Sequence, residues 1–479
     1  MVLDFAFMRR ALLIFGLVLL LVAPFSTDPL PFAVGCMTPW VLISIINKPN
    51  MPVAAIFYFF WQWAQIFARV LQSLIDGEAL AKGYSGPGVV YAYWYSLAGL
   101  VALAVAFRLV LGNLPRPTQE EEDAHLSWRP RDLLMLYAGT LVLAVICGFG
   151  ARYLSSLGQP FEAMGRLKVV AEFLLFTTVL ATRRDYKFMT AAALIEIGIG
   201  FTGLLSDFRG VFIYLAMAAI AARIRLSAMA IVGGIAWFAL LVALGLFWTA
   251  VKVDYRQFAT EGEETQNLSV PLGDRMAYLG NLAMNPGEID WGLASYGMLS
   301  RFAYIDIFGT VITVQDATRN PPTMRQWTEA LEHVFKPRFI FPDKAPLSDS
   351  ETYARLIGAD PAKTVRGDTS ISVGYFGENY VDLGFPGMLV GMFVLGLMIS
   401  GVIRYFMQVR TLPLMVRQGI ALAFIYHVCG SGIEISLPKL FGSIIMFFLV
   451  YLLLVKFVLP IALQWLNARS EAKETSQPS

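Results

Sequence analysis

The feature that most constrains this chain is a succession of apolar segments, each close to the roughly 20 residues that an α-helix needs to cross a bilayer. Hydrophobic residues make up 57% of the 479 residues and charged residues only 15%, whereas soluble proteins carry about 25% charged residues. Within lipid, a helix satisfies all of its backbone hydrogen bonds internally. We therefore expect an all-α polytopic membrane protein.

The apolar segments predict about 12 transmembrane helices, within a range of about 11 to 13. They lie near residues 8–25, 30–47, 51–74, 88–111, 132–155, 166–182, 188–206, 209–222, 228–251, 387–406, 416–432 and 438–460. The N-terminus resembles a signal peptide, but another apolar segment follows it almost at once, which favours an uncleaved first helix. The predicted units are a bundle of about nine helices (1–251), a large loop (252–386), about three further helices (387–460) and a tail (461–479).

Lys and Arg gather at one set of predicted helix ends, including Arg9-Arg10, Arg183-Arg184 and Arg469. Basic residues of short loops stay in the cytoplasm. This pattern predicts that both termini face the cytoplasm and that the loop 252–386 faces outward, into the periplasm if the cell is Gram-negative. The acidic run 120–123 is then expected to be a solvated cytoplasmic loop.

The loop 252–386 is polar overall, and its late position breaks the balanced halves expected of many transporters. Residues 293–314 turn apolar again, although Arg301 and Asp306 interrupt them. We expect a helix that lies at the interface or against the bundle, with a thirteenth span or a re-entrant hairpin as alternatives. Pro321-Pro322-Thr323 predicts the start of a short helix that ends near Phe335, with Thr as its cap. Residues 348–356 predict another short helix. A large insert of this kind is where a membrane protein usually acts.

Several function classes lack their sequence signals. The chain has no phosphate-binding GxxxxGK[ST], no HExxH and no Cys/His set with metal spacing, and its three cysteines all fall in apolar segments. ATP hydrolysis and zinc chemistry are therefore not expected, and we predict no cofactor and no metal. The formal net charge is +2 without a basic stripe, so no nucleic-acid partner is predicted.

A charged group in the hydrocarbon region costs at least about 2.5–3.5 kcal/mol on insertion scales, so each such residue needs a reason. The candidates are Arg69, Glu172, Glu196, Asp207, Arg209, His427 and Glu434. We expect Arg69 to extend to an interface and Glu196 to pair with another helix. Arg209 either binds phosphate oxygens or has a structural role, as the partner of Asp207 or as an anchor that fixes the orientation of the helix in the membrane. For His427 the alternatives are helix packing and proton transfer or hydrogen bonding near a substrate.

Within the loop, Arg338 and Lys344 flank a proline-stiffened aromatic segment, and two such cations can offset the charge of a diphosphate. Glu378 either acts as a general base of raised pKa or braces the loop by accepting backbone hydrogen bonds. Three aromatic residues either stack on sugar rings or belong to the interfacial aromatic belt. They are Tyr375, Tyr380 and Trp327.

The span number, the outer segment 206–210 and the strings 336–344 and 374–384 together resemble the Wzy-type oligosaccharide repeat-unit polymerases. The resemblance is close over about 50 residues, and elsewhere it concerns the architecture only. It implies a GT-C-type membrane glycosyltransferase of the bacterial cytoplasmic (inner) membrane. Such an enzyme joins undecaprenyl-diphosphate-linked oligosaccharides, donor and acceptor, into O-antigen or a related exopolysaccharide. A flippase and a chain-length regulator are its expected partners, beside membrane lipids.

From the chemistry of that reaction we expect Arg209, Arg338 and Lys344 to hold the diphosphate, and Glu378 or else His427 to act as the base. One alternative is an O-antigen ligase, in which only the acceptor differs. A lipid-linked oligosaccharide flippase or other transporter, and a non-enzymatic assembly or sensor protein, also remain open. If Arg209, Arg338, Lys344 and Glu378 converge on one outward cavity, the enzyme hypothesis is favoured. A path of charged residues running through the bundle would favour transport.

Overall fold

The computed structural model describes residues 2–83, 85–202, 207–262, 269–319, 321–336, 340–341, 344, 347–360 and 371–474. Over these ranges the chain is helical, with one isolated β-bridge between Val2 and Arg225. The expected all-α class is confirmed.

Each of the 12 predicted ranges corresponds mainly to one α-helix, and some ranges extend into a neighbouring short turn or helix. These helices are α1 (Phe5–Leu20), α2 (Pro29–Ile46), α3 (Ala54–Asp76), α4 (Gly88–Leu111), α6 (Pro130–Tyr153), α8 (Leu167–Thr182), α9 (Tyr186–Gly200), α10 (Arg209–Ala221), α11 (Ala228–Ala259), α18 (Gly374–Met407), α19 (Leu414–Cys429) and α20 (Leu437–Leu453). By length and hydropathy, six helices of the described ranges can cross a membrane alone: α2, α4, α6, α11, α18 and the continuous run from α20 to Glu471. The chain therefore has the helices of a multi-pass membrane protein.

The connecting segments are also largely helical. Outside the large loop they form α5 (Gln119–Asp123), α7 (Gly158–Gly165), α21 (Leu459–Glu474), the 3₁₀ turns η1 (Ala23–Phe25), η2 (Leu80–Lys82), η3 (Ala124–Ser127), η4 (Ser155–Leu157) and η6 (Gly432–Glu434), and the π-helical turn η7 (Leu454–Val458). Within the large loop they form α12 (Leu272–Met284), η5 (Pro286–Glu288), α13 (Trp291–Phe302), α14 (Ile305–Thr318), α15 (Arg325–Phe335) and α16 (Asp349–Leu356).

The large loop differs from its prediction in two places. The single helix expected over 293–314 is two helices, α13 and α14, which meet at a bend of 56° and count as one broken span or a re-entrant loop. The helix α15 begins after Met324, whose φ is +55°, so Thr323 is not its cap residue. The helix predicted over 348–356 is confirmed as α16, where the Ser348 side chain accepts a hydrogen bond from the backbone N–H of Glu351 (3.2 Å).

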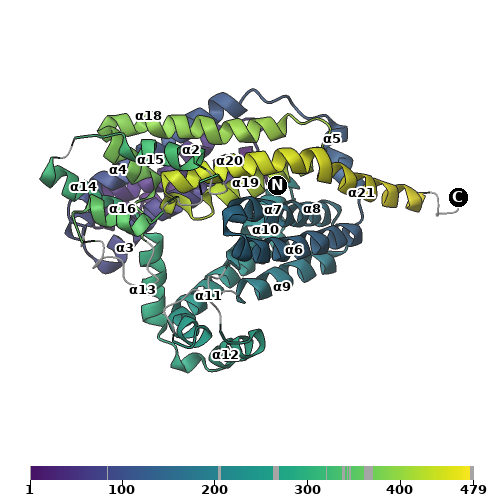
Figure 1. Cartoon of the computed structure of the whole chain (residues 1–479), viewed down its shortest axis with the longest axis horizontal. Coiled ribbons are helices and arrows are strands. Elements are labelled where there is room, and N and C mark those ends of the chain that lie inside the picture. Colours follow the sequence, from purple (N-terminus) through teal and green to yellow (C-terminus); the bar gives the residue numbers. More distant parts are fainter. Residues whose placement is uncertain are drawn as a thin grey trace.

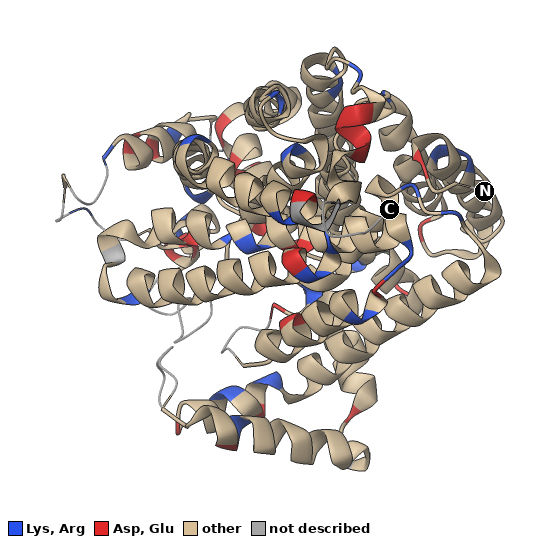
Figure 2. Ribbon diagram, turned by 90° about the vertical axis from the view of Figure 1, so that its right-hand side faces the viewer, with Lys and Arg blue, Asp and Glu red and all other residues tan. Residues whose placement is uncertain are grey.

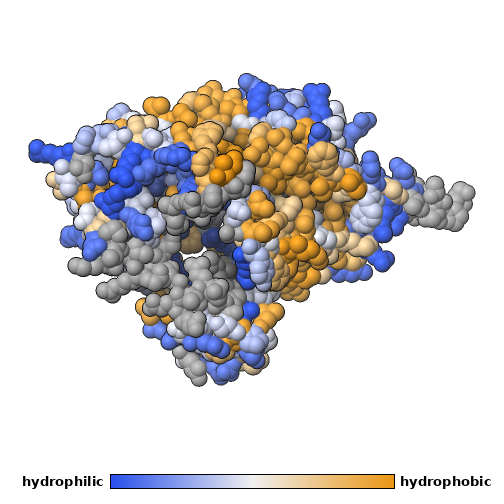
Figure 3. Space-filling view, in the orientation of Figure 1, coloured by the Kyte–Doolittle hydropathy of each residue, from blue (hydrophilic) through white to orange (hydrophobic). Residues whose placement is uncertain are grey.

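The long helices lie side by side along the longest axis of the molecule (Figure 1). Helices α14 and α16 lie toward one end, called here the α16 end, and α5 and α21 lie toward the other, called the α5 end. An apolar band separates hydrophilic surfaces at the two ends (Figure 3). This distribution is the one that a bilayer-spanning bundle requires.

Charged residues occupy little of the ribbon (Figure 2). Some of the buried ones are paired across helices, whereas Glu172 of α8 is fully buried and neither of its carboxylate oxygens has a hydrogen-bond partner among the described residues. Arg69 of α3 donates to Asp306 of α14 at 3.1 Å, and both side chains are 7% exposed. The expectation that Arg69 reaches an interface is therefore wrong, because a buried carboxylate on the loop helix α14 takes its charge. Glu196 pairs with Lys168 of α8 at 2.7 Å, which confirms the predicted interhelical pairing.

Candidate functional site

The α19–α20 loop (residues 430–437) is the centre of a polar cluster at the α16 end. Gln65 of α3 holds this loop: its Oε1 accepts from the backbone N–H of Ile433 (2.8 Å), and its Nε2 donates to the carbonyl of Ser431 (3.2 Å) and to Glu434 (3.0 Å). Gly432 has φ +69°, and a Cβ there would lie 1.7 Å from Gln65 Oε1. Only glycine permits both the turn and the contact.

The start of α18 fixes the other side of the α19–α20 loop. Tyr375 donates its backbone N–H to the carbonyl of Ile435 (2.8 Å), and Gly374, with φ +76°, brings the chain so close that a Cβ would lie 2.0 Å from the Ile433 carbonyl oxygen. Glu378 is 2% exposed, and its Oε2 accepts from the backbone N–H of Leu437 at 2.6 Å. This contact is the bracing role that was one of the two alternatives for Glu378.

Arg209, the first residue of α10, contacts the beginning of the same loop. Its Nη2 donates to the carbonyl of Gly430 (3.2 Å), and its guanidinium lies 5.3 Å from the ring centroid of Trp61. Its buried Nε has no hydrogen-bond partner among the described residues. The guanidinium is thus oriented by an aromatic face and one carbonyl, while part of its donor capacity is unused.

Arg166, which the sequence analysis did not single out, supplies a second cation. Its Nη1 lies 3.8 Å from Asp207 Oδ2, and its guanidinium is 5.2 Å from the ring centroid of Tyr426. The Tyr426 hydroxyl donates to the other Asp207 oxygen. Asp207 therefore pairs with Arg166 at the start of α8, not with Arg209 as one alternative had it, so Arg209 keeps its charge for another partner.

Glu434, which accepts from Gln65, lies within electrostatic range of Arg209 and Arg301. Burial raises the pKa of Glu434 to about 7, against the opposing attraction of Arg209 and Arg301 and its hydrogen bond from Gln65. A carboxyl group with this pKa exists in both protonation states near neutral pH, which is the property of an effective general acid or base. Arg301, at the last turn of α13, is the second arginine, after Arg209, whose charge reaches Glu434.

His427 lies one turn before the α19–α20 loop. Its ring centroid is 5.7 Å from that of Phe447, and its buried Nε2 has no hydrogen-bond partner among the described residues. The ring contact fits the packing alternative and the unused nitrogen fits the hydrogen-bonding one. Both alternatives for His427 therefore stay open.

The two loop cations predicted to hold a diphosphate are not part of this cluster as described. Arg338 lies outside the described residues. Lys344 donates from its Nζ to the carbonyl oxygens of His333 and Lys336 (2.9 Å to the latter), at the C-terminus of α15. A lysine in this position satisfies the terminal carbonyls of a helix and complements its dipole.

The three predicted sugar-binding aromatics pack within the protein. Tyr375 is fully buried, and its hydroxyl donates to Gln62, so in this conformation its ring offers no face to a sugar. Tyr380 stacks on Tyr95 with centroids 5.7 Å apart. Trp327 donates to Asn379 Oδ1 (3.0 Å). Tyr380 and Trp327 remain partly exposed and keep their predicted role as a prediction.

The cluster thus combines three arginines, a carboxyl group that titrates near neutrality and a rigid loop. We call Arg166, Arg209, Arg301 and Glu434 the outer cluster. Guanidinium groups bind phosphate oxygens through directed hydrogen bonds, so the outer cluster can hold a phosphate-bearing ligand beside a proton acceptor. No group of His, Cys, Asp and Glu able to hold a metal ion occurs within the described residues.

Searches found no match to this chain among protein-family models, curated proteins or solved structures. The outer cluster is therefore interpreted from its own residues and their geometry.

Proposed function

We propose that this protein is a membrane glycosyltransferase of GT-C type that polymerises polyprenyl-diphosphate-linked oligosaccharide repeat units at the outer face of the bacterial cytoplasmic membrane. The observation that carries the proposal is the outer cluster, in which Arg209 and Arg301 act on Glu434 beside the α19–α20 loop. Arg166 joins it through Asp207 and Tyr426.

A 12-span topology is part of the proposal and is supported by where the helices end. Residues that follow α2, α4 and α18 line one cavity at the α5 end, and the starts of α1, α3 and α19 line the same cavity. Along the chain, helices whose C-termini lie at the α5 end thus alternate with helices whose N-termini lie there, as successive membrane spans do. Because this end also carries the basic short loops, we assign it to the cytoplasm and the outer cluster to the outside.

The proposed reaction divides the work between the arginines and Glu434. Arg166 and Arg209 hold the diphosphate that links the growing glycan to its lipid. A hydroxyl of the incoming repeat unit attacks the anomeric carbon of that glycan, and the bond from this carbon to the diphosphate oxygen breaks. The polyprenyl diphosphate leaves with the electron pair, and fixed positive charge stabilises it. The hydroxyl proton passes to the Glu434 carboxylate.

Glu434 takes the role of base in this proposal because Glu378 is already engaged. Glu378 accepts a backbone hydrogen bond and is 2% exposed, so it has little access to an acceptor sugar. Glu434 is half-buried and borders two arginines. His427 remains the second choice for this role.

The test is polymer formation by the purified protein in liposomes that contain a lipid-linked repeat unit. We expect Arg166→Gln and Arg209→Gln to lose at least about 100-fold in initial rate, as loss of one charge-stabilising donor does. The exposed Arg325, which pairs with Glu329, serves as the matched control through Arg325→Gln. Glu434→Gln should be inactive and Glu378→Gln active, because an amide oxygen still accepts from Leu437. Full polymer from both arginine variants would overturn the site.

A second experiment separates this reaction from its alternatives. Cells that lack the protein should accumulate a full-sized single repeat unit on its lipid, exposed outside the membrane. Accumulation of finished polymer on the lipid would indicate a ligase. Accumulation of repeat units facing the cytoplasm would indicate a flippase.

A further inference from the structure

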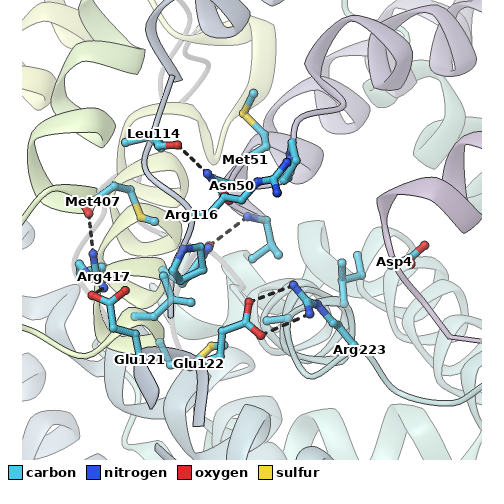
Figure 4. A pocket seen from close by; sticks show the side chains of 18 of the residues that line it. Asp4, Asn50, Met51, Leu114, Arg116, Glu121, Glu122, Arg223, Met407 and Arg417 are labelled. Atoms are coloured by element: carbon cyan, nitrogen blue, oxygen red, sulfur yellow. Dashed lines mark hydrogen bonds and ion pairs between the residues drawn. The ribbon is translucent and has the colours of Figure 1, made fainter. Parts of the chain in front are cut away.

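A cavity of about 1300 Å³ lies at the α5 end (Figure 4). It is lined by the ends of α8, α10 and α19 opposite to those next to Arg166, Arg209 and Glu434. Its walls come from the start of α1, the α2–α3 connection, the segment 114–126 and the adjoining ends of α10, α18 and α19. Ligand sites are commonly about 300–1,000 Å³. The cavity is therefore large enough for a small molecule or for a lipid headgroup with part of its chains.

Two of the four acidic residues that line the cavity are in ion pairs, whereas Asp4 and Asp123, among the described residues, accept hydrogen bonds only from uncharged groups. Glu121 accepts from Arg417 Nη2 at 2.8 Å, and both oxygens of Glu122 accept from Arg223 at 3.2 and 3.3 Å (Figure 4). Asp4 caps the start of α1 through the backbone N–H of Phe7. The run 120–123 is thus not the simple solvated loop that was expected, because Glu121 and Glu122 pair with arginines of α19 and of the residues after α10.

Three cations of the lining are left over after this pairing. Lys48, Arg116 and Arg410 border the cavity, and none of them has an ion-pair partner within the ranges that the structure describes. They come from three different segments of the chain. Asp4 and Asp123 also border the cavity without an ion pair in the described part of the chain, so five basic and four acidic residues leave the lining one positive charge in excess.

Two buried ring and guanidinium nitrogens in the same lining also lack partners. Arg417 is 5% exposed; its Nη groups bind Glu121 and the Met407 carbonyl, but its Nε is unsatisfied among the described residues. His125 is 4% exposed, and its Nδ1 lies 2.8 Å from the Glu122 carbonyl while its Nε2 has no partner. Buried polar atoms of this kind are rarely left without a partner. They therefore indicate a polar ligand.

Part of the remaining lining is apolar and adaptable, beside polar side chains such as Asn50 and Gln418. Met51, Met407 and Met415 contribute flexible thioether side chains, and Phe5 adds an aromatic ring. Methionine-rich surfaces adjust to ligands of varied shape. A ligand of this cavity is thus expected to combine negative charge with an apolar part.

We propose that this cavity is a second binding site, on the cytoplasmic side, for a phosphate-bearing ligand. Lys48, Arg116 and Arg410 supply the balancing charge, and the methionines contact the apolar part. Basic pockets between transmembrane helices on the cytoplasmic side are known to take lipid headgroups, and arginine binds phosphate oxygens in the same way whether the phosphate is free or part of a lipid. The proposal is independent of the transferase reaction at the other end.

The experiment uses the full-length protein and the triple variant Lys48→Gln, Arg116→Gln, Arg410→Gln. The control triple variant is Arg131→Gln, Arg184→Gln, Lys187→Gln, which removes three exposed cations outside the lining. Thermal unfolding is measured in detergent with and without inorganic pyrophosphate, and in nanodiscs of phosphatidylglycerol or phosphatidylcholine. Native mass spectrometry counts the phospholipid retained by each protein.

We expect a ligand-dependent rise of about 2 °C or more in wild type and control, and none in the cavity variant. A rise with pyrophosphate identifies a free phosphate compound as sufficient. A rise confined to phosphatidylglycerol nanodiscs, together with retained lipid, identifies the headgroup of a membrane lipid. Absence of any rise in wild type, or equal losses in the two triple variants, would overturn the proposal, since surface charge alone would then account for the cations.

Discussion

If the outer cluster carries out the proposed transfer, Arg209→Gln should change the pH dependence of that reaction, in addition to weakening donor binding. Burial raises the pKa of Glu434 to about 7, and Arg209 and Arg301 hold it below what burial alone would give. Without the Arg209 charge the pKa of Glu434 rises further. Because a general base acts as its carboxylate, activity then begins at a higher pH.

The size of this change follows from the charge removed. An opposite charge nearby lowers a carboxyl pKa by about 1 to 3, and the lower value applies to a half-buried pair. A change of 1 corresponds to about 1.4 kcal/mol. Wild type should reach half its maximal rate near pH 7 and the variant near pH 8, so at pH 7 the ionised fraction of Glu434 falls about fivefold.

The assay is the initial rate of polymer formation in liposomes, measured from pH 5.5 to 9 at saturating lipid-linked repeat unit. Arg301→Gln should move the low-pH side of the rate-versus-pH profile to higher pH as well. Arg325→Gln should leave that side of the profile at the wild-type pH. If Arg209→Gln lowers the rate at every pH without changing the pH of the half-maximal rate, then Glu434 is not the group whose ionisation controls the rate. The same conclusion follows if Glu434→Gln retains the low-pH side of the profile.

Three further predictions concern stability. Gly432→Ala should destabilise the protein by about 1–3 kcal/mol, because it combines a positive φ with a contact to Gln65; thermal unfolding checks this, and Gly280→Ala in α12, with open space around the new Cβ, should cause no loss. Asp306→Asn should lower the free energy of unfolding by about 3–5 kcal/mol, because it leaves Arg69 buried without its charged partner. The double variant Arg69→Met, Asp306→Leu should recover most of that loss, as measured by chemical denaturation. Burial lowers the pKa of His125, against the raising effects of its hydrogen bond to Glu122 and of Asp123, so the folded state holds it neutral. Its contribution to stability is present above the unfolded pKa of about 6.5 and is lost as pH falls below it; His125→Gln should therefore flatten the decline of Tm between pH 7 and 5, and an unchanged decline would contradict this reasoning.

The course of the helices was largely readable from hydropathy, because a membrane helix must be both long and apolar. The predicted range 228–251 matches the apolar part of α11, which nevertheless continues to Ala259. Polar residues after 251 prolong this helix, since its backbone hydrogen bonds are internal and do not need an apolar sequence. The bend between α13 and α14 has no comparable signal in hydropathy.

Contacts between residues that are far apart in the sequence could not be predicted from a single sequence. Arg69 and Asp306 are 237 positions apart, and each was interpreted alone. Arg166 was hidden because it stands at the start of an apolar range, where a basic residue is ordinary. A useful signal was available in Glu434, a carboxyl group that follows Gly430-Ser431-Gly432 at a predicted helix end, but its neighbours Gln65 and Arg301 lie in other parts of the sequence.

The α19–α20 loop also bears on how the protein matures. Arg209 and Gln65 obtain their partners from residues that lie 221 and 366 to 369 positions later in the chain. If α3 and α10 cross the membrane as in the proposed topology, they enter it with these polar side chains unmatched until α19 and α20 are synthesised. A translocon or membrane chaperone that shields them would therefore be needed most during that interval, and a ribosome stalled before residue 430 would leave an inserted but inactive intermediate.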